Sequence, residues 1–295
     1  MKNFTIKTSV FVLLVTMLGF GCSEYSAKKQ VNEAEEILQH NVQEAKSIFY
    51  MLPSPIETAS LMQKAGAEYD ASILNPVLNV NKYELASTKA LNLGVYGSDL
   101  SYASVFDQTQ EVIFYLSSCK KLADGLGLTN AFDAATMVRI EENINDKDSL
   151  LHLISDSYWM VDAYLEENER SNLSALIISG GWVEGLYIAT RLALTNPTQE
   201  LVDRVAEQKL SLTHLLAIIN TYKGDHGDVN DVYTELLEIQ TIFDKIELTK
   251  ETVETSTNLE TGITTIGGAT RMTLSNAVLE EISTKIESIR NRYIQ

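Results

Sequence analysis

The sequence predicts an all-α protein, built as an antiparallel helical bundle or a short array of helical hairpins. Apolar residues recur at steps of three and four in one segment after another, which is the spacing of a buried helix face. The breaks between these segments carry residues that begin and end helices. Patterns typical of strands are almost absent. Together these observations predict about nine helices.

The first such segment stops at "LPSPIE", residues 52–57, where two prolines interrupt it and Pro55 can open the next helix. In "TNPTQE", 195–200, we expect Asn196 or Thr195 to cap a helix whose first turn holds Pro197. The five predicted apolar faces are Leu38, Val42, Ala45, Phe49 and Leu52; Leu151, Ile154, Tyr158, Val161 and Leu165; Val202, Val205, Leu212, Leu216 and Ile219; Val232, Leu236, Ile239, Phe243 and Ile246; and Leu279, Ile282, Ile286, Ile289 and Tyr293.

One segment does not fit the helical pattern. "TSTNLETGITTIGGATRMTLS", 255–275, is rich in Thr and Gly and has no apolar helix face. Loops longer than about 15 residues are uncommon in compact domains, and they are often functional or disordered. We expect either a mobile loop or a small hairpin here.

The N-terminus has the order of a secretory signal: a charged start, then an apolar run from Val10 to Leu18, then small residues. The apolar run is shorter than the about 20 residues that a membrane-spanning helix needs. "LGFGC", 18–22, resembles a loose form of the box that ends bacterial lipoprotein signals, and it is similar to the boxes of Bacteroidota lipoproteins. The resemblance covers about the first 25 residues.

The resemblance implies a signal peptide over 1–21 and a lipid attached to Cys22, with a polar tether over 22–30. From the helical spacing we expect a single helical domain over 31–295. It also implies a place in the cell envelope, as an outer-membrane lipoprotein that faces the periplasm. A disulfide from Cys22 to Cys119 is the alternative in an oxidising compartment. A metal or redox role would need a second Cys or a His nearby, and the sequence has none there.

The net charge of −17 bears on the choice of partners. Residues 1–21 contain two lysines and no acids, so their removal makes the charge about −19. Such a chain is repelled by nucleic acid phosphates and by anionic lipid headgroups. We therefore expect no nucleic acid partner, and we expect the lipid anchor to hold the protein at its membrane.

Two segments resemble each other at an offset of 85 residues, "ALNLGVYGSDLSY" from Ala90 and "ALIISGGWVEGLY" from Ala175. Each is followed by a second similar pair, "TQEVI" at 109 and "TQELV" at 198. One interpretation is an internal duplication, with units over 31–127 and 128–223 and a C-terminal helical pair over 228–295. The matched residues are Ala90/Ala175, Leu91/Leu176, Leu93/Ile178, Gly94/Ser179, Asp99/Glu184 and Tyr102/Tyr187.

The same segments hold the most unusual residues of the chain. Gly180, Gly181 and Gly185 each weaken a helix by up to about 1 kcal/mol relative to Ala, which favours a close crossing of two helices as their purpose. The alternative is a groove between the two units that binds a partner or ligand, because aromatic rings with polar tips are typical of recognition surfaces. The residues of that groove would be Tyr96, Asp99, Tyr102, Trp182, Glu184 and Tyr187.

No catalytic motif, metal-ligand spacing or cofactor fingerprint is present in the sequence. We therefore name no catalytic residue, metal or cofactor. The favoured function is non-enzymatic binding or scaffolding, with another envelope protein as one expected partner. Two alternatives stay open: an enzyme whose site is assembled around Asp99 and Glu184, and a carrier of an apolar ligand inside the bundle.

Overall fold

The computed structural model describes residues 52–128, 138–140, 142–144, 146–224, 226–250, 254–257, 264–267 and 270–295, without the side chains of 159 and 248–271. The chain divides into two units, Met1–Ser47 and Ile48–Gln295, and all described residues belong to the second. The predicted signal peptide 1–21, Cys22, the tether 22–30 and the apolar face from Leu38 to Phe49 lie outside the described residues.

The all-α prediction is confirmed. In the described part of the chain, two short 3-10 helices, η1 (Ala71–Ile73) and η2 (Val77–Asn81), separate the first two α-helices. The α-helices are α2 (Pro55–Lys64), α3 (Ala86–Val105), α4 (Thr109–Gly125), α6 (Lys147–Glu167), α7 (Ser171–Thr195), α8 (Gln199–Tyr222), α9 (Gly227–Phe243) and α10 (Asn276–Tyr293).

The predicted apolar faces within the described residues coincide with four of these helices, α6, α8, α9 and α10, and almost all of their residues are buried. Helix α2 begins as predicted, with Pro55 in its first turn. Ser54 caps it, and Glu57 completes a capping box. The predicted cap of α8 was wrong. Thr198 caps this helix, because its backbone is extended and its hydroxyl accepts from the N–H of Leu201 at 3.2 Å.

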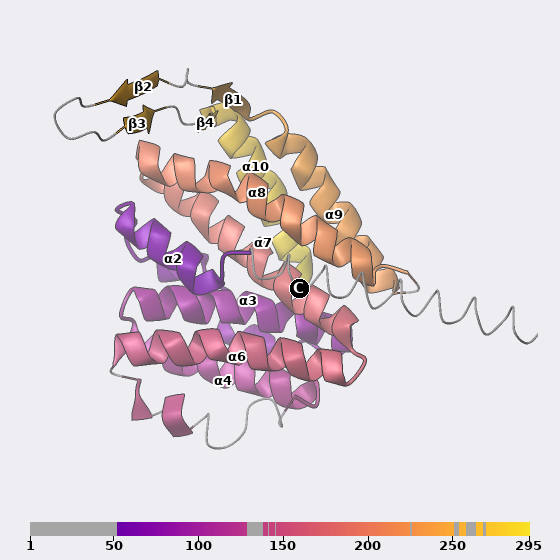
Figure 1. Ribbon diagram of the computed structural model, residues 1–295. Coiled ribbons are helices and arrows are strands. Elements are labelled where there is room, and N and C mark those ends of the chain that lie inside the picture. The colour runs from indigo at the N-terminus through magenta and orange to yellow at the C-terminus, as the bar shows by residue number, and fades with distance from the viewer. Residues whose placement is uncertain are drawn as a thin grey trace, which may run out of the picture. The chain divides into compact units, whose positions relative to one another are not determined.

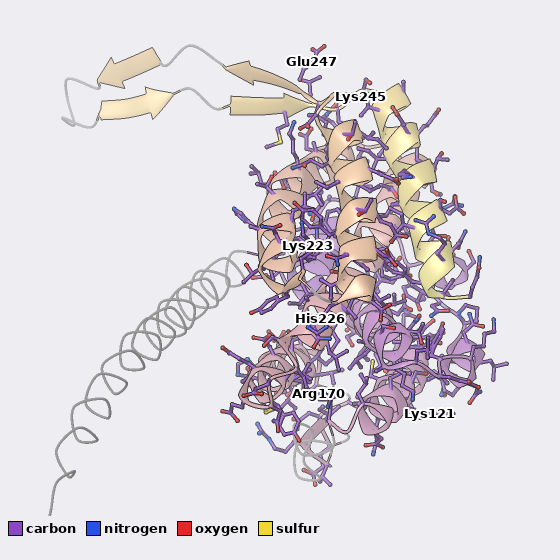
Figure 2. All side chains as sticks on the ribbon, turned by 90° about the vertical axis from the view of Figure 1, so that its right-hand side faces the viewer. Lys121, Arg170, Lys223, His226, Lys245 and Glu247 are labelled. Carbon is purple, nitrogen blue, oxygen red and sulfur yellow. The ribbon has the colours of Figure 1, made fainter. Side chains whose placement is uncertain are left out.

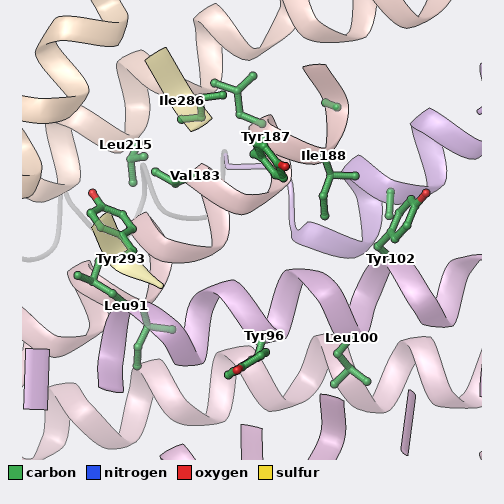
Figure 3. Packing of buried hydrophobic residues seen from close by; sticks show 14 of the residues in the cluster. Leu91, Tyr96, Leu100, Tyr102, Val183, Tyr187, Ile188, Leu215, Ile286 and Tyr293 are labelled. Carbon is green, nitrogen blue, oxygen red and sulfur yellow. The ribbon is translucent and has the colours of Figure 1, made fainter. Parts of the chain in front are cut away.

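Helix α7 lies between two groups of helices (Figure 1). On one side α3 packs against α4 and α6. On the other side α9 packs against both α8 and α10, and all three contact α7. Figure 3 shows buried side chains of α3 and α7, with residues of α8 and α10 beyond α7. Tyr96 and Leu100 of α3 lie on the side of that helix away from α7. One continuous hydrophobic core joins the two groups.

Helices α3 and α7 are buried on nearly every side. Within the described residues, α7 is long and apolar enough to cross a membrane, but 83% of its most apolar window is buried inside the protein. This burial is what the core helix of a folded domain shows. It also explains why neither helix displays one clear apolar face in the sequence.

The Thr/Gly-rich segment contains strands, so the small hairpin is the alternative that the structure supports. Strand β1 (Glu247–Lys250) pairs antiparallel with β4 (Thr270–Thr273), and β2 (Glu254–Thr257) pairs antiparallel with β3 (Thr264–Gly267). The pairing begins before the predicted limit of 255. Figure 2 shows the four strands extending away from the ends of α9 and α10.

Candidate functional site

Glycines allow the backbones of α3 and α7 to touch. A Cβ atom added at Gly94 would lie 1.9 Å from the carbonyl oxygen of Ile177, and one at Gly180 would lie 2.0 Å from that of Leu91. No side chain fits at such distances, so only glycine permits this approach. The predicted close crossing is confirmed at Gly180.

The two helices run in the same direction through this crossing. Gly94 lies against Ile177, and one turn later the hydroxyl of Ser98 donates to the carbonyl of Gly181 at 2.7 Å. Residue numbers therefore rise together on both helices. As a result, residues at matched positions of the two similar segments lie near each other.

Asp99 and Glu184 meet in this way, and both are completely buried. Arg290 of α10 holds Glu184 with two hydrogen bonds, from Nε to Oε2 at 2.8 Å and from Nη2 to Oε1 at 2.9 Å. Its Nη2 also donates to the carbonyl of Ile73 at 3.1 Å. The buried guanidinium thus forms a two-point hydrogen-bonded pair with Glu184.

Asp99 accepts fewer hydrogen bonds than Glu184 does. Its Oδ2 accepts from the backbone N–H of Asn75 at 3.2 Å, whereas its Oδ1 has no hydrogen-bond partner within the described part of the chain. Burial raises the pKa of Asp99, and the neighbouring charge of Glu184 raises it further. Burial also raises the pKa of Glu184, but the guanidinium of Arg290 opposes that shift.

The balance of charge favours one proton for the two acids. One guanidinium balances one carboxylate, so a second ionised carboxylate would be an uncompensated buried charge. A protonated Asp99 makes the cluster of Asp99, Glu184 and Arg290 electrically neutral. The proton also supplies a donor on the side of Asp99 that faces Glu184.

Two tyrosines of the predicted groove hydrogen-bond to the segment that precedes α3. The hydroxyl of Tyr96 donates to the carbonyl of Pro76 at 3.0 Å, and that of Tyr102 donates to the carbonyl of Glu68 at 3.1 Å. Tyr187 instead stacks its ring under Arg290, with Cζ 4.4 Å from the ring centroid.

The prediction of an open groove needs correction. The segment 65–85 covers α3, and α10 covers α7, so most of the predicted groove residues face the interior. Trp182 alone of the six is partly exposed. The five buried residues are Tyr96, Asp99, Tyr102, Glu184 and Tyr187.

Two residues that bind the acid pair, Asn75 and Arg290, were not predicted from the sequence. Arg290 had a detectable signal, because it follows Ile286 by four residues and Ile289 by one, on the apolar face of α10. A charged residue on a buried helix face requires a buried partner. Asn75 had no such signal, since its role depends on the course of an irregular segment.

Trp182 opens onto a pocket between α2, α6, α7 and α8. Its indole N–H donates to the hydroxyl of Ser211 at 2.9 Å. The pocket has a free volume of about 80 Å³, which is smaller than the usual range of small-molecule sites. Thus the one accessible residue of the predicted site lies at a cavity.

The described residues contain no group of three His, Cys, Asp or Glu side chains that could hold a metal ion. Cys119 is a buried free thiol, and burial raises its pKa. The acid pair has the chemistry of a proton donor and acceptor, but neither residue exposes any surface to a substrate.

Comparisons with protein-family models, with curated proteins and with solved structures gave no match for this chain.

Proposed function

We propose that the chain is a lipid-anchored protein of the cell envelope, at the outer membrane and facing the periplasm, whose helical body binds another molecule without catalysing a reaction. The anchor rests on the resemblance of "LGFGC" to a lipoprotein box. The binding role rests on the pocket at Trp182, which is where the predicted site is accessible.

One observation argues against an enzyme built on Asp99 and Glu184. The two acids are sealed in the core, and Arg290 is held by Glu184 and a backbone carbonyl. Catalytic acids must reach the group that they protonate or deprotonate. This arrangement supports a structural role for the acid pair.

The anchor is tested by mass spectrometry and fractionation. We expect the wild-type chain to begin at an acylated Cys22 and to sediment with membranes, because two or more acyl chains give stable attachment. The Cys22→Ser variant should lose both the acyl mass and the sedimentation. An unmodified thiol at Cys22 in the wild type would refute the anchor.

The binding role is tested by photo-crosslinking in intact cells. A photoreactive amino acid at Thr58, on the pocket wall, should give a specific adduct, whereas one at Ile113 on α4 should not. Ile113 is an exposed apolar residue that does not line the pocket, so it controls for unspecific capture. Equal labelling from both positions would argue against a binding site at the pocket.

A further inference from the structure

Two leucines at one end of α3 are the most exposed large apolar side chains in the described part of the chain. Leu78 of η2 is 78% exposed, and Leu85, which directly precedes α3, is 67% exposed. Single exposed leucines are ordinary, whereas several that share a surface indicate an interaction site. Both leucines lie in the segment that leads into α3, so the same end of the helix presents them.

The local structure does not explain either leucine. No residue of η2 is buried. Leu85 occupies the N-cap of α3, and its side chain makes no capping hydrogen bond. Ser, Thr, Asp or Asn at this position would accept from the first N–H groups of the helix and stabilise it. The chain therefore keeps an apolar side chain where folding favours a polar one.

The end of α4 brings lysines to these leucines. The amine of Lys121 donates to Oδ1 of Asn81, whose Nδ2 donates to the carbonyl of Leu78 at 3.2 Å. The stem of Lys89, in the first turn of α3, crosses Gly125 of α4, where an added Cβ would lie 3.2 Å from its Cε. The start of α3 and the end of α4 thus form one surface, here called the lysine tip. Its members are Leu78, Lys82, Leu85, Lys89, Lys120 and Lys121.

The lysine tip is basic, although the chain as a whole is acidic. Residues 71–90 and 117–128, which form it, contain four lysines and two acids, Glu84 and Asp124, so their net charge is +2. Asp124 pairs with Lys120 at 2.8 Å. The whole chain has a charge of −17. Because charges more than about 10 Å apart are largely screened at 0.1 M salt, a surface that approaches this end interacts with the tip rather than with the whole chain.

The N-terminus of α3 adds to the preference of the lysine tip for anions. The N-cap side chain accepts from none of the first N–H groups, and the first turn contains no acid. Such a helix end carries a partial positive charge and binds phosphate groups readily. Lysines, uncapped N–H groups and exposed leucines together match the headgroup layer of an anionic phospholipid membrane, where phosphates lie above acyl chains.

We propose that the lysine tip docks on anionic phospholipid headgroups, with Leu78 and Leu85 inserted among them and the lysines bound to phosphates. The proposal rests on the membrane location proposed above and adds the orientation of the helical body there. The net charge of the chain opposes binding, so the tip alone binds weakly. Next to an anchor, weak binding is enough to decide which end of the body faces the lipid.

The test uses the chain from residue 22 onward with Cys22→Ser, since a leader or an acyl chain would itself bind lipid. The protein is sedimented with vesicles of phosphatidylcholine and phosphatidylglycerol in equal parts, and with vesicles of phosphatidylcholine alone. We expect binding at low salt to the anionic vesicles only, and release in about 1 M salt, where the screening length is about 3 Å. Absence of binding by a folded chain, or equal binding to both vesicles, overturns the proposal. The anchor is decided separately, by mass spectrometry at Cys22.

Lys82→Gln and Lys64→Gln are a matched pair, because both lysines are exposed and both changes remove one charge. Lys64 lies far from the tip, since its neighbour Gln63 donates to the carbonyl of Val105 at the other end of α3. We expect Lys82→Gln to lower the partition coefficient about fivefold, the usual contribution of one lysine near an anionic surface. Lys64→Gln should bind as the parent chain does. Equal affinity of the two variants would place the lipid contact elsewhere and overturn the proposal.

Leu85→Ser tests insertion, with Leu210→Ser as its control. Leu210 is 57% exposed on α8, in the other group of helices (Figure 1). Burial of a leucine side chain predicts roughly tenfold weaker binding or worse for Leu85→Ser, and no change for Leu210→Ser. Serine can cap α3, so Leu85→Ser should unfold at no lower temperature than the parent chain. A variant that is as stable as the parent and binds equally well would refute insertion at the tip.

A polarity-sensitive dye on an introduced cysteine reports the orientation directly. With Cys22→Ser the remaining Cys119 is buried, so the introduced thiol is the accessible one. We expect anionic vesicles to shift the emission of dye at Leu85→Cys to the blue and to leave dye at Leu210→Cys unchanged. Equal shifts at both positions would contradict docking through the tip. A chain that ignores every vesicle, yet crosslinks a protein from a photoreactive residue at position 85, would assign the tip to a protein partner and overturn the lipid proposal.

Discussion

Helices α3 and α7 carry similar segments in different surroundings, and the difference is clearest at their acids. Glu184 of α7 receives two hydrogen bonds from Arg290, whereas Asp99 of α3 receives one from a backbone N–H. Both are completely buried. One buried cation favours the ionised form of one acid, and the second acid is then accommodated by holding its proton.

The matched tyrosines differ in the same way. Tyr102 of α3 accepts from the N–H of Asp70 and donates to the carbonyl of Glu68, so it fastens a loop. Tyr187 of α7 lies against Arg290. The α3 side is thus held by backbone groups of the segment 65–85, and the α7 side by a single charged residue of α10.

Loss of the Arg290 guanidinium should lower the stability of the protein most. We expect Arg290→Met to lower the free energy of unfolding by about 3 to 5 kcal/mol, because Glu184 is left as an uncompensated buried charge. Arg292→Met is the control on the same helix, since Arg292 pairs with Glu235 at the surface and should cost about 1 kcal/mol or less. Urea denaturation followed by circular dichroism measures both, and equal losses would contradict the charge balance described here.

The second-largest loss of stability is expected where the backbones of α3 and α7 touch. Gly180→Ala forces a methyl group against the carbonyl of Leu91, so α3 and α7 must separate, at a cost of about 3 kcal/mol. Gly181→Ala, one residue later, places its Cβ at an ordinary 3.5 Å from the nearest atom. Its cost in the same urea titration should be below about 1 kcal/mol, and a Gly180→Ala variant that is equally stable would refute the close crossing.

The shared proton predicts a dependence on pH. In the folded chain Asp99 stays protonated to a higher pH than in the unfolded chain, because burial and Glu184 raise the pKa of this group. The stability that it contributes is complete below the ordinary pKa of Asp, about 3.9, and is lost as the pH rises through the raised value.

Asp99→Asn cannot ionise and removes this loss. The variant's free energy of unfolding minus that of the wild type should therefore increase as the pH rises. At the acidic end this difference should be below about 1 kcal/mol. A constant difference between the two proteins from acidic to neutral pH would show that Asp99 does not carry the proton.

The smallest expected effect is at Gly185. Gly185→Ala should stabilise the protein by up to about 1 kcal/mol, because alanine favours a helix and its methyl group meets no neighbour. Thermal unfolding measures the gain. Destabilisation would mean that this glycine has a packing role like that of Gly180.

The helical class, the faces of α6, α8, α9 and α10 and the close approach at Gly180 were predictable from the sequence, because each depends on local spacing or on a residue with one special property. The proximity of Asp99 and Glu184 also followed from the matched segments. Their burial was not predictable, since it depends on how the irregular segment 65–85 covers α3. The pocket at Trp182 was not predicted for a similar reason. The sequence does not distinguish Gly185 from Gly180, because only the structure shows the space around each.

The position of Arg290 also bears on the order in which the protein folds. A chain made from its N-terminus produces Asp99 and Glu184 long before α10, so the two acids must wait in water for their counter-ion. Closing the crossing of α3 and α7 before α10 has packed would bury Glu184 without its cation, which is costly. Docking of α10 and closure of the crossing are therefore expected to be coupled.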